Sequence, residues 1–163
     1  MGDATNDRFC RPSTAQTDYE VARSPQGYRI RPRRPVIYLD SSVALAHLFA
    51  EDRVLSKSIW QQPLISSRLL EYEVWNRIHA RGLGSSHGDA ARALIGRVAL
   101  IEMTPPVLGR ALEPFIISVR TLDALHLASI EYIRSRMQLI ELASFDERLL
   151  AAARALDVPI CQL

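Results

Sequence analysis

The stretch "VIYLDSSVALAHLFA", residues 36–50, decides the fold, because it reads as a strand that runs directly into a helix. Residues 36–39 are β-branched, aromatic or aliphatic, which is typical of a short buried strand. Ser41 and Ser42 then open a segment of helical periodicity, and a hydroxyl is a frequent helix cap. Asp40 stands at the junction. The stretch therefore predicts an α/β fold with an acid at the carboxyl end of its first strand.

Strands and helices continue to alternate along the rest of the chain. Short runs of β-branched or aliphatic residues predict strands at 63–66, 99–103, 138–144 and 158–163. Periodic apolar residues predict helices at 52–62, 67–82, 85–98, 105–116, 121–136 and 146–157. This alternation, with connections long enough to cross over, predicts a three-layer α/β/α fold. Its central sheet would be mainly parallel, with four to five strands and helices on both faces.

The first 35 residues differ from the rest in composition. They are rich in Arg, Pro, Ser, Thr and Asp, show no sustained period, and carry seven arginines against four acids. We interpret residues 1–35 as a flexible N-terminal extension and residues 36–163 as one domain with enough apolar residues for a core. The extension is either a solvated tail or a segment whose Arg31, Arg33 and Arg34 touch phosphates.

Charge and cysteine usage narrow the functional classes. The extension holds seven of the 20 basic and four of the 18 acidic residues, which leaves 13 basic and 14 acidic residues at 36–163. This balance does not favour binding of nucleic acid through bulk positive charge. No segment has the roughly 18 to 20 apolar residues of a membrane helix, and the N-terminus lacks the apolar part of a secretory signal, so we expect a cytoplasmic protein with no membrane contact. Cys10 and Cys161 fit no zinc spacing, and we expect both to be reduced thiols.

Ligand sites of parallel sheets lie outside the carboxyl ends of the strands, and two acids stand there, with a third able to join them. Asp40 and Asp146 each follow a predicted strand, and Asp123 lies in the first turn of helix 121–136, where we expect Thr121 to be the cap. Glu73 lies inside an apolar helix. Each of these aspartates could also be explained as a helix cap, since a carboxylate there accepts from free N–H groups.

If these acids lie close together, their mutual repulsion has to be relieved. Two carboxylates about 5 Å apart repel by about 3 kcal/mol at an effective dielectric constant of about 20. Either their pKa values are raised or divalent cations neutralise them. An oxygen-only ligand set favours Mg²⁺ or Mn²⁺ over zinc. Such a site suits activation of water against a phosphodiester.

Four segments, in this order, resemble the acidic motifs of PIN-domain ribonucleases, and most closely those of the VapC toxins of type II toxin–antitoxin systems. They are "VIYLDSSVALAHLF" (36–49), "ISSRLLEYEVWNRIHARG" (65–82), "RTLDALHLASI" (120–130) and "LASFDERLLAAARALDVPI" (142–160). The resemblance covers residues 36–163 and implies that this region is a PIN domain.

The resemblance implies that Asp40, Glu73, Asp123 and Asp146 are the catalytic residues and hold one or two Mg²⁺ or Mn²⁺ ions. It further implies a metal-dependent endoribonuclease that hydrolyses RNA by water attack and leaves a 5′-phosphate and a 3′-hydroxyl. The implied partners are an antitoxin whose basic C-terminal segment covers the acidic cleft and a second copy of the toxin in a homodimer.

Some assignments stay open at this level. Glu71 and Glu73 are about 200° apart around a helix, so only one can face the acids; the family spacing favours Glu73. By the same resemblance, Ser41 and Ser144 are candidates for holding water or substrate, or else they are local hydroxyl caps.

Two basic side chains also stand near the acids. We expect His126 to be a packing residue or a hydrogen-bond partner rather than a metal ligand. Arg77 either pairs with Glu73 four residues before it or meets a phosphate.

Two other functions compete with the nuclease. A noncatalytic PIN-like binding module would use its acids as caps, with no metal affinity and no perturbed pKa values. A phosphatase that forms an aspartyl-phosphate is weaker, because its nucleophilic Asp needs a second acid two residues later, where this chain has Ser42.

Overall fold

A computed structural model of the chain describes residues 35–50, 58–136 and 139–163. Within these residues four strands form one sheet, in the order β3-β2-β1-β4. The strands are β1 (Val36–Leu39), β2 (Leu64–Ser67), β3 (Val98–Ile101) and β4 (Ile140–Ala143). All neighbouring pairs are parallel, and β1 lies between β2 and β4. The predicted parallel sheet is confirmed, with four strands.

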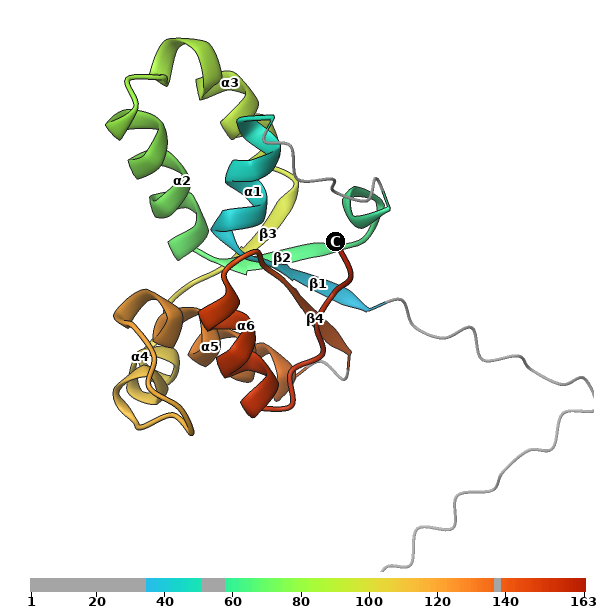
Figure 1. The fold of residues 1–163 in the computed structure, drawn as a ribbon, viewed down its shortest axis with the longest axis vertical. Helices are drawn as coiled ribbons and strands as arrows, with labels where there is room; N and C mark the ends of the chain where they lie inside the picture. Colours follow the sequence, from blue (N-terminus) through green and yellow to red (C-terminus); the bar gives the residue numbers. More distant parts are fainter. Residues whose placement is uncertain (1–34, 51–57, 137–138) are drawn as a thin grey trace, which may run out of the picture. The chain divides into compact units, whose positions relative to one another are not determined.

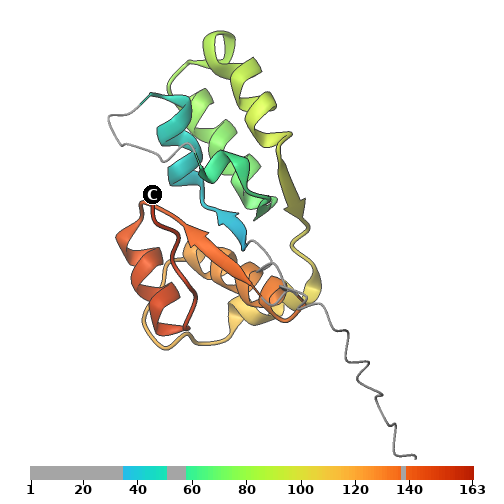
Figure 2. The same cartoon turned by 90° about the vertical axis from the view of Figure 1, so that its right-hand side faces the viewer.

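In the described part of the chain, six α-helices cover the two faces of the sheet (Figure 1). Helices α1 (Ser41–Leu48), α2 (Leu69–Ala80) and α3 (Gly84–Ile95) lie on one face. Helices α4 (Pro105–Leu112), α5 (Thr121–Arg134) and α6 (Glu147–Ala155) lie on the other, and the turned view in Figure 2 separates the two groups in the same way. The predicted three-layer arrangement is therefore confirmed.

The alternation of side chains along β1 explains the two layers of helices. Ile37 and Leu39 point to one face and belong to the apolar cluster beneath α1, α2 and α3. Tyr38, fully buried between them, points to the other face and packs with Leu127 and Ile130 of α5. Since successive side chains of a strand alternate, an apolar strand buried on both faces needs helices on both.

Three predictions about local structure were wrong in the described residues. Of the helix predicted at 52–62, residues 51–57 lie outside the described part, and residues 59–61 form only a 3₁₀ turn, Ile59–Gln61. The predicted strand at 158–163 is reduced to one parallel bridge, between Ile160 and Leu142. Thr121 does not cap α5: the N-cap is Arg120, whose own side chain makes no capping hydrogen bond.

Three further observations concern the described part of the chain. The predicted extension lies on residues 1–34, outside the description, as does Cys10, whereas Cys161 is a free thiol. Among the described helices none has the length and apolarity needed to span a membrane. Helix α2 ends just before Gly82, whose φ of +66° is the left-handed conformation that glycine adopts without steric cost.

Candidate metal centre

Asp40 follows directly after β1, so the central strand delivers its carboxylate to the carboxyl edge of the sheet. The residue is only 4% exposed. Its Oδ2 accepts hydrogen bonds from the backbone N–H of Ser42 at 3.2 Å, from the Ser144 hydroxyl at 2.9 Å and from the Ser42 hydroxyl. These donors fix the carboxylate in one orientation and cap the first turn of α1.

Glu73 reaches the same edge from α2, because the apolar face of that helix is packed on the sheet. Val74 and Ile78 are fully buried beneath it, which leaves the neighbouring position 73 at the rim. Glu73, Asp40 and His126 each offer one possible ligand atom, and these atoms lie within 4.8 Å of one another.

His126 of α5 is the residue that links the two carboxylates. Its Nε2 lies 2.9 Å from Glu73 Oε2 and 3.6 Å from Asp40 Oδ1, while its Nδ1 lies 2.9 Å from the Tyr38 hydroxyl. Burial opposes a positive charge on this ring, but Tyr38, Glu73 and Asp40 together raise the pKa of His126 well above its ordinary value. His126 makes the hydrogen bonds expected of it, and it is also one of three residues whose atoms could hold a metal ion.

Asp123, in the first turn of α5, lines the same cleft as Asp40, Glu73 and Asp146. Burial raises the pKa of the Asp123 carboxyl, and the negative charges of Asp146 and Asp40 raise it further. The backbone N–H of Arg120 acts in the opposite direction. The main cause of the shift is therefore burial, and the neighbouring acids add to it.

Asp146 is the N-cap of α6 and also faces the cleft. Its Oδ1 accepts from the backbone N–H groups of Arg148 at 2.8 Å and Leu149 at 3.3 Å. One carboxylate oxygen of Asp146 thus accepts from the start of α6, so the same side chain caps this helix and lines the cleft.

The cleft that these acids line has a volume of about 450 Å³. The structure brings all four predicted acids to it, and Ser41 lines it as well. Ser144 contacts Asp40 directly. Ser42 was expected only as a helix cap. Its hydroxyl donates to Asp40, lies 3.4 Å from the Ser144 hydroxyl and accepts from Phe145 N–H. Ser41 and Ser42 both follow Asp40 directly, so the sequence alone does not show which of the two hydroxyls contacts its carboxylate.

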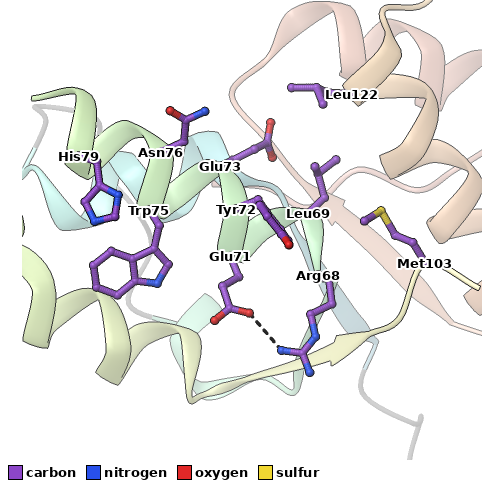
Figure 3. A pocket seen from close by; sticks show the side chains of 10 residues that line it. All are labelled: Arg68, Leu69, Glu71, Tyr72, Glu73, Trp75, Asn76, His79, Met103 and Leu122. Atoms are coloured by element: carbon purple, nitrogen blue, oxygen red, sulfur yellow. Dashed lines mark hydrogen bonds and ion pairs between the residues drawn. The ribbon is translucent and has the colours of Figure 1, made fainter.

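A larger cavity of about 880 Å³ adjoins the acidic cleft and shares Glu73 and Leu122 with it. Figure 3 shows its lining along α2, with Glu71 turned toward Arg68 at the far end from Glu73. The Glu71 carboxylate pairs with the Arg68 guanidinium at 3.0 Å. Of the two candidate glutamates, the one that lines the acidic cleft is therefore Glu73.

A parallel α/β sheet with carboxylates gathered at its carboxyl edge defines a class of proteins that bind ligands there through acids. Comparison with known families identifies the class: the PIN domain family model matches residues 37–155. The chain therefore belongs to the PIN-domain family, and its curated relatives are VapC ribonucleases.

Two of these relatives come from Mycobacterium tuberculosis. Ribonuclease VapC46 (strain ATCC 25618 / H37Rv) is 34% identical over 129 residues, which cover 76% of this chain and 95% of the relative. Ribonuclease VapC47 (strain CDC 1551 / Oshkosh) is 28% identical over 126 residues, covering 73% of this chain and 90% of the relative.

A solved structure confirms the fold. The crystal structure of Mycobacterium tuberculosis VapC20, described as a toxin that cleaves the sarcin–ricin loop, superposes with a TM-score of 0.55. The match covers 71% of this chain and 94% of that chain, at 21% sequence identity.

Proposed function

We propose that this protein is the toxin of a type II toxin–antitoxin system and acts as a metal-dependent endoribonuclease. It would hydrolyse RNA phosphodiester bonds in the cytoplasm by attack of water, leaving a 5′-phosphate and a 3′-hydroxyl. Membership of the PIN family and the VapC relatives support the class of enzyme. The observation that carries the proposal is the meeting of Asp40 and Glu73, 33 positions apart in the sequence, with ligand atoms within 4.8 Å.

The residues present fit a divalent cation. Two carboxylates at this separation repel by about 3 kcal/mol at an effective dielectric constant of about 20, and Asp146 and Asp40 each raise the pKa of the Asp123 carboxyl, which burial raises most. Asp40, Glu73, Asp123 and Asp146 would hold the ion, and oxygen ligands favour Mg²⁺ or Mn²⁺. When bound, such a cation supplies positive charge for a phosphate and lowers the pKa of water.

The chain itself contributes orientation. Ser42 and Ser144 hold Asp40 from one side, and His126, anchored by Tyr38, holds Glu73. Both of these serine hydroxyls donate to Asp40, and in this proposal they orient that carboxylate. This arrangement supports water as the attacking group and the acids as the groups that position it.

The proposed partners follow from the charge of the cleft. Four acids in one cavity favour a cationic ligand, which supports an antitoxin with a basic C-terminal segment. Apolar side chains exposed on and after α4, Leu112 at 89% and Ile116 at 72%, together with Tyr72 of α2 at 70%, are available for protein contacts such as a homodimer.

The noncatalytic PIN-like module remains the alternative function. In such a module the acids would serve only as helix caps, and their pKa values would be ordinary. Asp146 and Asp40 do cap helices. The contact between Glu73 and the buried His126 favours the catalytic proposal instead, since Glu73 lies within α2 and caps no helix start.

The deciding experiment is cleavage of a mixed RNA pool by the intact chain with Mn²⁺, with Mg²⁺ and with a chelator. Asp123→Asn keeps the size of the side chain and removes its charge, and we expect it to abolish cleavage. Asp89→Asn is a matched control, because Asp89 pairs only with Arg92 on the surface of α3. Cleavage that persists in the chelator, or in Asp123→Asn at the rate of the control, would refute the proposal.

A further inference from the structure

Two arginines line the acidic cleft beside the four acids. Arg77 lies on α2, one turn after Glu73, and Arg120 is the N-cap of α5, three residues before Asp123. Both residues are exposed. They therefore project from two different elements that flank the proposed metal centre.

These two guanidinium groups have no ion pair, side-chain hydrogen bond or ring contact within residues 35–50, 58–136 and 139–163. Most described arginines differ, because they bind a carboxylate, a carbonyl oxygen or an aromatic ring: Arg68, Arg81, Arg92, Arg97, Arg110, Arg134 and Arg136. Two exposed arginines of α6, Arg148 and Arg154, also lack such side-chain contacts among the described residues, and neither lines the cleft.

The nearby acids explain why the cleft arginines stay unpaired. Glu73 could reach Arg77 at the i, i+4 spacing, but its Oε2 is bonded to His126. Asp40 is held by Ser42 and Ser144, and Asp146 by the N–H groups of α6. One oxygen of each of these three acids is thus already bonded within the protein, and the two exposed guanidinium groups beside them are available to an anion.

We propose that Arg77 and Arg120 bind RNA phosphates next to the one that is cleaved. This inference rests on the proposed endoribonuclease function. A cleft lined by four carboxylates repels a polyanion beyond the reach of its metal, and two cations at the rim offset that repulsion where the strand must lie. A guanidinium group suits the task, because its planar fork binds phosphate oxygens in pairs.

The other role open to these arginines is to neutralise the acids in the metal-free protein. The two roles predict different effects of removing the charge. Loss of a neutralising cation strengthens Mn²⁺ binding and leaves RNA affinity at saturating Mn²⁺ unchanged. Loss of a phosphate contact weakens RNA binding and lowers its dependence on salt.

The test uses the full chain, with Arg77→Ala, Arg120→Ala and the double variant, and with Arg154→Ala as the matched control for loss of an unpaired surface charge. Binding of a labelled single-stranded RNA of mixed sequence is measured by anisotropy in the Asp123→Asn background over a series of KCl concentrations. We expect each cleft substitution to weaken binding about tenfold at low salt. We also expect each to reduce the slope of log K against log[salt] by about 0.7.

Cleavage by the same variants with Asp123 intact separates this inference from the proposed function. We expect a higher KM in Arg77→Ala and Arg120→Ala at saturating Mn²⁺, with partial recovery in the lysine variants. If the control cleaves RNA and the double variant matches it in KM, affinity and salt slope, the inference is wrong and the function stands. If even the unmodified chain does not cleave RNA, both fail.

Discussion

At the scale of single residues, Glu71 and Glu73 provide a matched pair two positions apart on α2. Glu73 Oε2 contacts the buried His126, whereas Glu71 pairs with Arg68 on the surface. We expect Glu73→Gln to lower kcat/KM for RNA cleavage by about 100-fold or more, because it removes a carboxylate that would hold the divalent cation. Glu71→Gln should stay near the unmodified rate, since an exposed ion pair contributes little. The reverse order of the two rates would show that the metal centre is assigned to the wrong glutamate.

Asp123 allows a prediction about stability in the absence of metal. Its folded pKa is raised by burial and by Asp146 and Asp40, so its ionised form destabilises the folded state relative to the unfolded chain. In EDTA at neutral pH, Asp123→Asn should therefore have a higher free energy of unfolding than the unmodified protein. The gain should vanish as the pH falls through the raised pKa toward the ordinary value of 3.8, because Asp123 is then protonated in both states. Urea unfolding at several pH values measures this difference; a gain that grows on acidification would contradict the cause given for the shift.

At the scale of elements, Asp146 both starts α6 and faces the cleft, and two substitutions separate these roles. Asp146→Asn keeps an oxygen that can accept from Arg148 and Leu149 N–H, so we expect nearly unchanged stability but weaker metal-dependent cleavage. Asp146→Ala loses the cap and should cost about 1 kcal/mol in addition. Thermal unfolding and cleavage rates of both variants are compared. Equal activity of Asp146→Asn and the unmodified chain would restrict Asp146 to capping.

The elements also show what the sequence could predict. The strands β1 and β4 and the helices α1, α5 and α6 were predicted within a few residues, because each has a dense apolar pattern bounded by a polar residue. The wrong predictions fell on weaker patterns. Residues 158–163 look like a strand, but only Ile160 forms a bridge, with Leu142. An edge segment needs a partner along its whole length, and local sequence does not show how far that partner extends.

The four acids of the site could be predicted from the sequence, but the residues that contact them could not. Asp40, Glu73, Asp123 and Asp146 carry a local signal, the position after a strand or on a helix near the edge. The contact of His126 with Tyr38 spans 88 positions and runs through the core, and that of Ser144 with Asp40 spans 104. Such pairs depend on the packing of α5 and β4 against β1, which no local periodicity encodes.

At the scale of the whole molecule, a preformed acidic cleft should make folding stability depend on metal. A ligand that binds only the folded state at 100 times its Kd adds about 2.7 kcal/mol. We expect millimolar Mn²⁺ to raise the Tm by several degrees relative to EDTA. The double variant Asp40→Asn, Glu73→Gln should lose this response while Asp89→Asn keeps it. An equal shift in all three proteins would indicate Mn²⁺ binding elsewhere.

The first strand, β1, pairs with the last one, β4, and this pairing has a consequence during synthesis of the chain. Asp40 directly follows β1, the first strand, yet its carboxylate receives a hydrogen bond from Ser144, just after β4. The early acids are translated more than 60 residues before β4 can dock beside them. A growing polypeptide on the ribosome, or a fragment that ends between residues 124 and 139, therefore contains Asp40, Glu73 and Asp123 without Asp146 and without Ser144, one of the two serines that donate to Asp40. We expect such a shorter chain to lack the assembled acidic cleft, because β1 then has no neighbour on the side where β4 lies.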